Sequence, residues 1–244
     1  MLFQELMADH SGIEWTEATW NPTIGCTKVS PGCDRCYAER ITQRFRTNFP
    51  NGFQLTLRPE ALELPRKWRR SRMIFVDSMS DLFHADVPEP YIATVFDVMK
   101  DCPQHTFQIL TKRAQRLARV GAKLAWPSNV WMGVSVESPT YEWRVNYLRQ
   151  VPAAVRFISA EPLLAAMPSI NLEGIDWLIA GGESQPGARR TDVEWFRDLR
   201  DRCNRAGVAF FLKQLGGHPS KRGGEEALLD GRRWTELPEP MSRS

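Results

Sequence analysis

Short apolar runs recur along this chain, and stretches with the spacing of amphipathic helices separate them. Each run is rich in β-branched and aromatic residues and is apolar on both faces, as strands buried inside a parallel sheet are. The runs are residues 73–76, 106–110, 130–134, 155–158, 177–180 and 208–212. The helical stretches are residues 88–100, 113–120, 139–150 and 192–206. Strands that alternate with helices predict an α/β fold with a parallel sheet, either open or closed into a (β/α) barrel.

The first part of the chain adds one strand and one helix to this pattern. We expect a strand within residues 17–24, although Pro22 lacks the N–H that a sheet ladder needs. A helix is expected over residues 34–45. Its first backbone N–H groups would face the preceding loop and stabilise negative charge there.

Polar residues or glycines follow the predicted strands at their carboxyl ends. They include Ser78, Ser80, Asp81, Ser135, Glu137, Glu161, Gly181, Gly182, Glu183 and Lys213. In a parallel barrel these strand ends share one face, which is where active sites are built. The ordinary alternative is that loops are polar and that Ser or Thr caps the next helix. We expect a shared functional face, with Glu137 and Glu183 as solvated residues of its mouth.

Composition and length are those of an ordinary globular protein, with 244 residues, 42% hydrophobic and 25% charged. We expect one barrel-type domain over residues 1–215 and a C-terminal extension over 216–244, because regular apolar patterning stops near Gly216. The net charge of +3 allows a polyanionic partner but does not argue for one. The first residues lack a signal-peptide pattern and no apolar stretch reaches the length of a membrane span, which favours the cytoplasm.

Three cysteines stand close together in the segment 25–37. Cys26, Cys33 and Cys36 share this loop, whereas Cys102 and Cys203 are isolated in the sequence. Clustered thiolates bind zinc or iron–sulfur clusters, and three ligands leave one metal position open for chemistry. Close cysteines in a secreted chain would indicate disulfides instead, but a reducing compartment favours a metal or cluster site.

Several motifs carry a resemblance to known families. A cysteine triplet in the first strand–helix loop of a partial barrel resembles the radical S-adenosylmethionine enzymes. The segments 25–39, 78–84, 110–113, 133–137, 161–164 and 181–189 resemble a phage- and bacteria-associated family of unknown function with a three-cysteine motif. This resemblance extends from about Ile13 to Leu237. It implies an α/β fold with a partial, TIM-like (β/α) barrel.

The resemblance also implies a cofactor and a reaction. Cys26, Cys33 and Cys36 would hold a 4Fe–4S cluster whose fourth iron binds S-adenosylmethionine, and reductive cleavage would yield a 5′-deoxyadenosyl radical. By position, the amino group of S-adenosylmethionine would contact Ser78, Ser80 and Asp81. Its ribose would contact Ser135 and Glu137, and its adenosyl moiety would pack on Gly181 and Gly182. The substrate would face Glu161, Glu183 and Lys213, although a Glu–Lys pair there could equally be a structural ion pair.

The sequence departs from the radical-enzyme pattern at two points. Six residues separate Cys26 from Cys33 where three are usual, and Arg35 rather than an aromatic residue precedes Cys36. The alternative function is therefore a zinc- or cluster-stabilised binding module without catalysis, with His84 as the nearest candidate for a fourth ligand. The expected partners of the enzyme are nucleic acid or a nucleotide and an electron donor of ferredoxin or flavodoxin type. The basic run 66–72 precedes the amino end of a strand, so we interpret it as a solvated face.

Overall fold

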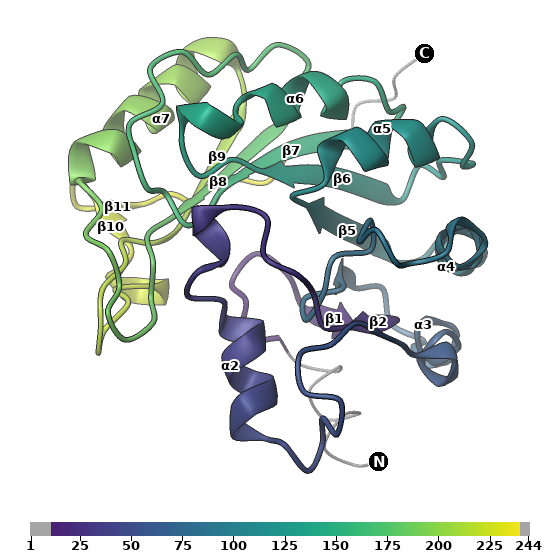
Figure 1. Cartoon of the computed structure of the whole chain (residues 1–244). Coiled ribbons are helices and arrows are strands. Elements are labelled where there is room, and N and C mark those ends of the chain that lie inside the picture. The colour runs from purple at the N-terminus through teal and green to yellow at the C-terminus, as the bar shows by residue number, and fades with distance from the viewer. Residues whose placement is uncertain (1–10, 240–244) are drawn as a thin grey trace.

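The computed structural model describes residues 11–239 of the chain. Its centre is a sheet of seven parallel strands in the order β1-β4-β5-β6-β7-β8-β9. The strands are β1 (Ala18–Trp20), β4 (Met73–Val76), β5 (Thr106–Thr111), β6 (Val130–Ser135), β7 (Val155–Ala160), β8 (Trp177–Gly181) and β9 (Ala209–Gln214). The sheet curls into a half-barrel, so the predicted partial barrel is confirmed (Figure 1).

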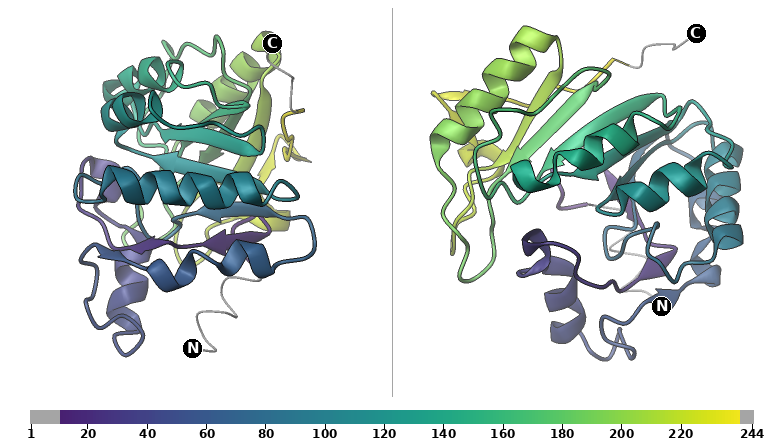
Figure 2. Two further views of the ribbon diagram at one scale, coloured as in Figure 1. Left: turned by 90° about the vertical axis from the view of Figure 1, so that its right-hand side faces the viewer. Right: turned by 45° about the horizontal axis from the view of Figure 1, so that its top comes forward.

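Helices cover the outer, convex face of this sheet. They are α3 (Leu64–Lys67), α4 (Glu89–Asp101), α5 (Ala114–Gly121), α6 (Trp143–Leu148) and α7 (Val193–Ala206). Figures 1 and 2 show them along the outside of the curl, whereas α2 (Tyr37–Arg44) stands apart on the open side. The four long predicted helices are confirmed, except that a 3-10 turn at Pro139–Tyr141 separates the start of the third from α6. The main hydrophobic core lies between sheet and helices.

The inner face of the half-barrel carries a second core, which is largely aromatic. Alternate residues of a strand point to opposite faces, so Ile74 and Val76 join the outer core while Phe75 joins the inner one. The inner cluster is Trp15, Phe75, Trp131, Val155, Phe157, Trp177, Ile179 and Phe211. Further along the same strands, towards their carboxyl ends, the inward positions become polar. This change places a polar rim above an aromatic floor.

The predicted strand within residues 17–24 is two strands. β1 joins the main sheet, and β2 (Thr23–Ile24) pairs instead with β3 (Thr56–Leu57) in a separate antiparallel ladder. Pro22, which cannot donate to a ladder, lies at the break between them. The predicted helix over 34–45 is shorter, because Cys36 has an extended backbone and the helix α2 begins at Tyr37.

The C-terminal segment contacts the edge strand β9. Thr235 forms an antiparallel bridge with Phe211, and β10 (Leu228–Leu229) pairs with β11 (Arg232–Arg233) to form a small hairpin. These contacts cover an edge that would otherwise present unpaired backbone groups. The division of the chain at residue 215 stays a prediction. Within residues 11–239, none of the helices has the length and apolar character needed to cross a membrane.

Candidate active site

A cavity of about 210 Å³ lies at the carboxyl ends of the strands. All three clustered cysteines line it. Of the other predicted site residues, Ser78, Ser80, Asp81, Ser135, Glu161, Gly182, Glu183 and Lys213 line it as well. Glu137 and Gly181 do not. The half-barrel therefore brings most of these residues to one face, as the strand-end pattern predicted.

The cysteine loop leaves β2 through a sharp backbone turn. Gly25 has a φ of +86°, and a Cβ atom there would lie 2.2 Å from the carbonyl oxygen of Gln54. This position therefore requires glycine. The Cys26 amide donates to the carbonyl of Phe53 at 3.1 Å, and Ser80 Oγ donates to the Gly25 carbonyl at 2.6 Å. The first cysteine is thus fixed by backbone contacts on both sides.

Cys36, the last cysteine of the loop, immediately precedes α2. The first backbone amides of this helix therefore face its sulfur, as the sequence predicted. Burial raises the pKa of Cys36, and hydrogen bonds from the backbone amides of Glu39 and Ala38 act in the opposite direction. Tyr37, the next residue, donates its hydroxyl to the Ser78 carbonyl and lines the cavity. The helix N-terminus therefore offers donors to Cys36 itself.

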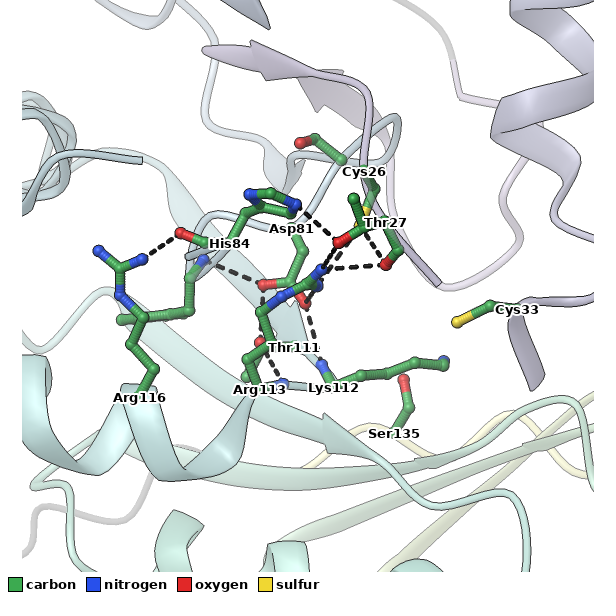
Figure 3. Close-up of polar contacts among 12 residues, drawn as sticks. Cys26, Thr27, Cys33, Asp81, His84, Thr111, Lys112, Arg113, Arg116 and Ser135 are labelled. Carbon is green, nitrogen blue, oxygen red and sulfur yellow. Dashed lines mark hydrogen bonds and ion pairs between the residues drawn. The ribbon is translucent and has the colours of Figure 1, made fainter. Parts of the chain in front are cut away.

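Cys26 has a different environment, in which burial, a carboxylate and a guanidinium act together. Arg113 Nη1 lies 3.4 Å from its sulfur and 2.8 Å from the Asp81 carboxylate (Figure 3). Burial and the Asp81 carboxylate raise the pKa of the Cys26 thiol to about 11, although Arg113 acts in the opposite direction. The strand-end segment containing Arg113 was part of the sequence pattern, but a role beside a cysteine could not be predicted from it.

The donor set fits a thiolate-bound metal or cluster, although the thiols do not surround one point. Within residues 11–239, no three His, Cys, Asp or Glu side chains are gathered closely enough to hold a metal ion. Figure 3 shows Cys33 set apart from Cys26 and its contacts. The chemistry nevertheless suits a soft centre, since three thiols from one loop line one cavity, with helix amides and a guanidinium beside them. Binding would need the loop to draw the sulfurs together.

His84 is poorly placed to serve as a fourth ligand. Its side chain is only 2% exposed, and Nε2 lies 2.9 Å from Thr27 Oγ1. Its Nδ1 accepts a hydrogen bond from the Asp86 amide at 3.2 Å. Both ring nitrogens are therefore engaged. Burial and the nearby Arg113 lower the pKa of His84, which favours the neutral ring.

The polar residues after β4 hold the site together. Asp81 accepts from the Thr111 hydroxyl at 2.7 Å and from the backbone amides of Phe83 and Lys112 at 3.0 and 3.1 Å. Ser78 Oγ donates to the Asn21 side chain at 3.1 Å. These groups line the cavity, and their hydrogen bonds connect the segment after β4 to the end of β5 and to the β1–β2 connection.

Glu137 is not a solvated residue, so that expectation was wrong. Its side chain is fully buried, with one oxygen 2.8 Å from Arg144 Nη1. The other oxygen accepts from Ser30 Oγ at 2.5 Å and lies 3.4 Å from Lys112 Nζ. Glu137 therefore connects α6, the β5–α5 loop and the cysteine loop. Arg144, the cation that makes this possible, was not identified from the sequence, because it lies within a helix rather than at a strand end.

Glu183 forms a second anchor for the cysteine loop and is also buried, contrary to expectation. Arg189 binds both of its oxygens, and Arg35 lies 3.4 Å away. Arg189 also donates to the Pro31 carbonyl at 2.8 Å. Burial disfavours the charged carboxylate, but the two arginines outweigh it and hold the pKa of Glu183 below its usual value. Glu183 thus holds the loop through Arg189 at Pro31, next to the Ser30 contact of Glu137.

Glu161 and Lys213 form an ion pair on the cavity wall, with Nζ and Oε1 2.5 Å apart. Their side chains keep 20% and 14% exposure, so the pair is accessible from the cavity. Gly181 lies beside it, where a Cβ atom would come 3.3 Å from the Glu161 side chain. Gly182 lies against backbone, with a Cβ position 2.4 Å from the Leu215 carbonyl oxygen. Both glycines therefore serve close packing at this edge.

The same fold occurs in spore photoproduct lyase. The lyase complexed with dinucleoside spore photoproduct gives a TM-score of 0.51 at 12% identity, covering 82% of this chain and 64% of that chain. A cysteine-to-serine variant of the lyase gives 0.50 at 13% identity, covering 81% and 63%. This chain thus spans less than two thirds of the lyase's length, and the similarity concerns the fold alone. No curated protein matches the chain.

A family match covers almost all of the chain. Residues 10–238 match the family described as "Protein of unknown function (DUF5131)". The matched segment includes the cysteine loop and every strand of the half-barrel. An association with phages stays a prediction. The chain belongs to the DUF5131 family of proteins of unknown function.

Proposed function

We propose that this protein is an iron–sulfur enzyme of the radical S-adenosylmethionine type, with Cys26, Cys33 and Cys36 as cluster ligands. The observation that carries the proposal is that all three thiols line one cavity at the carboxyl ends of parallel strands. That edge is where α/β barrels hold their active sites. When bound, a 4Fe–4S cluster with one open iron supplies the electron that cleaves S-adenosylmethionine to a 5′-deoxyadenosyl radical.

Fold similarity supports this reaction class. Spore photoproduct lyase, which shares the half-barrel, is a radical S-adenosylmethionine enzyme and was solved with a dinucleoside photoproduct. By analogy we propose nucleic acid or a nucleotide as the substrate and DNA or RNA modification or repair as the outcome. The proposed electron source is a protein of ferredoxin or flavodoxin type.

The cavity residues divide into two proposed roles. Ser80, Asp81 and Glu183 position the cysteine loop, because their polar atoms are already bonded to it or to its neighbours. Glu161 and Lys213 face the substrate, since their pair is partly exposed on the wall. Because both charges have some access to the cavity, either one can pair with a polar substrate group without leaving its former partner as a fully buried, unpaired charge.

We propose that Ser78, Ser135 and Gly182 contact S-adenosylmethionine. All three line the cavity with the cysteines. Ser135 ends β6 opposite Ser159 of β7, and both side chains are nearly fully buried. Hydroxyls in such a position can donate to and accept from a ribose.

The helix after the cysteine loop supports a polyanionic substrate. Arg40 and Arg44 lie one turn apart on α2, Arg46 follows its end, and all three are exposed. Within residues 11–239, none has an acidic partner, although Arg44 also lies over the Phe45 ring. Because α2 starts at the cavity, these guanidinium groups could bind phosphates of a nucleic acid whose reacting part enters the mouth.

Metal content tests the cluster. Anaerobically purified protein should be brown and contain iron and sulfide, and each of Cys26→Ala, Cys33→Ala and Cys36→Ala should lose most of the iron. Cys102→Ala and Cys203→Ala are the matched controls and should retain it. Zinc without sulfide would instead indicate the binding module. A single variant of the loop that kept the full cluster would contradict the three-ligand assignment.

Cofactor cleavage tests the reaction. Under anaerobic reduction with dithionite, S-adenosylmethionine should change the spectrum of the reduced cluster and release 5′-deoxyadenosine slowly. A cluster that is indifferent to S-adenosylmethionine would refute the radical enzyme and leave the binding module.

Two charge-removal variants test the substrate class. Changing Arg40, Arg44 and Arg46 to Gln should weaken binding of single- or double-stranded DNA and reduce its salt dependence. The matched control removes Lys67, Arg69 and Arg70, which are also exposed but precede the amino end of β4. Equal losses in both variants would indicate unspecific attraction, and that result would contradict binding at α2.

A further inference from the structure

One arginine connects a cysteine of the loop with the sheet. Arg113 immediately precedes α5, and its side chain is 11% exposed. Its Nη1 reaches Cys26 Sγ at 3.4 Å and Asp81 at 2.8 Å, and its Nη2 reaches the carbonyl and hydroxyl oxygens of Thr27 at 3.0 Å (Figure 3). An Nη group carries two hydrogens, so Nη1 can serve the sulfur and the carboxylate together.

The three cysteines differ in their neighbours. Cys36 lies before the first turn of a helix, and Cys33 Sγ lies 3.8 Å from the hydroxyl of Ser30. In the described part of the chain, Cys26 is the member of the triplet whose sulfur accepts from a guanidinium. Cys26 is therefore the cysteine whose sulfur lies beside a guanidinium.

Asp81 supplies the opposite charge and is itself held firmly. Its carboxylate accepts from a hydroxyl and two backbone amides, and its side chain is 7% exposed. Such a fixed carboxylate orients the guanidinium towards Cys26 and also offsets part of its charge. The sulfur therefore faces an oriented donor whose net electrostatic effect depends on two residues.

We infer that Arg113 and Asp81 are positioning residues that set the reduction potential of the proposed cluster through Cys26. This inference rests on the function proposed above. Hydrogen bonds to cluster sulfurs and nearby charge are among the factors that set such potentials. Reduction adds negative charge, so the Arg113 cation stabilises the reduced state, while Asp81 counteracts it. A largely buried pair exerts this effect more strongly than solvated charges would.

The two residues therefore predict shifts in opposite directions. Arg113→Gln removes the cation and should move the midpoint potential to a more negative value. Asp81→Asn leaves the cation without its counter-charge and should move the potential to a more positive value. Arg113→Lys keeps the charge but loses the fork that reaches four acceptor atoms, so its potential should lie between those of the parent and Arg113→Gln. A merely structural role would lower cluster content in each variant without opposite shifts.

The experiment is a redox titration monitored by electron paramagnetic resonance on anaerobically purified protein, with iron measured in each sample. Arg116→Gln is the matched control, since Arg116 lies one turn further on and donates to backbone carbonyls of His84 and Val87 rather than to a cysteine. It should shift the potential less than Arg113→Gln does.

The outcomes separate the two proposals. Parent protein without an iron–sulfur cluster would overturn both the function and this inference. A normal parent cluster whose potential stays constant in Arg113→Gln and Asp81→Asn, or shifts in the same direction in both, would overturn the inference and leave the function intact. If Arg113→Gln retained no iron, the Arg113→Lys and Asp81→Asn samples would decide by the same criterion.

Discussion

Replacing Glu137 by Gln is the sharpest test of how the cysteine loop is held. The carboxylate is fully buried and lies between Arg144 and Lys112, with Arg144 itself almost completely buried. Gln preserves the size of the side chain but not its charge. The single side-chain oxygen of Gln could still accept from Arg144, and its amide nitrogen would then face Lys112 and the Ser30 hydroxyl. The change therefore leaves two cations without their counter-charge.

The expected loss of stability is large. Removing one partner of a buried ion pair costs about 3–5 kcal/mol, because the remaining charge stays buried without compensation. Whole domains are stable by only about 5–15 kcal/mol. Glu137→Gln should therefore lower the free energy of unfolding by a large fraction of the total. It should also lower the iron content, since the Ser30 contact fixes the segment between Cys26 and Cys33.

Urea unfolding followed by tryptophan fluorescence measures this loss, because Trp20 and Trp177 are fully buried in the two cores. Glu161→Gln is the matched control, since the Glu161–Lys213 pair is partly exposed and its loss should cost about 1 kcal/mol or less. Equal free energies of unfolding for parent and Glu137→Gln would refute the argument from burial.

Two further substitutions test the elements around the cavity. Burial raises the pKa of Asp77 to about 8, above the unfolded value near 4, so the folded state binds the extra proton and loses stability as pH rises between those values. Asp77→Asn keeps hydrogen-bond partners for Thr23 without a charge. Its free energy of unfolding should therefore rise relative to that of the parent from pH 5 to pH 8, by up to about 1.4 kcal/mol per pH unit. A difference in the free energy of urea unfolding that stayed constant over this pH range would contradict this. Gly32→Ala places a Cβ atom 2.5 Å from Glu137 Oε1 and should cost about 1–3 kcal/mol and some iron, whereas Gly12→Ala, with open space around it, should cost neither.

The strands and helices of the parallel sheet could be predicted from the sequence because their signals are local, whereas the partial barrel was implied by the family resemblance. Residues 73–76 and 177–180 are apolar on both faces, and the structure places both segments in strands with a core on each side. The N-terminal break was harder to predict, since Pro22 indicates a weak ladder but not which strand each half will join.

The roles of individual site residues were less predictable than their location. Glu137 and Glu183 follow strands, as predicted, but burial depends on partners that are distant in sequence or lie in irregular segments. Arg144 comes from α6 and Arg189 from the long β8–α7 connection, and neither position has a periodic signal. A strand-end carboxylate that faces solvent and one that holds a loop have the same local sequence. Only the paired cation distinguishes them.

The pairing of β6 with β7 explains why the cysteines line a cavity rather than a packed core. In β6 and β7, Gly133 pairs with Phe157, and a Cβ atom at Gly133 would lie 2.3 Å from the Phe157 ring. Two residues further on, Ser135 pairs with Ser159, and both line the cavity. The inward side chains of β7 thus change from large and aromatic to small and polar within two residues. The aromatic cluster fills the inner face below the cavity, and the cysteine loop lies at the cavity's other side, along the carboxyl ends of the strands. Because Glu137 holds the loop at Ser30 and Glu183 holds it through Arg189 at Pro31, a change in either anchor should alter the position of the thiols before it alters the sheet.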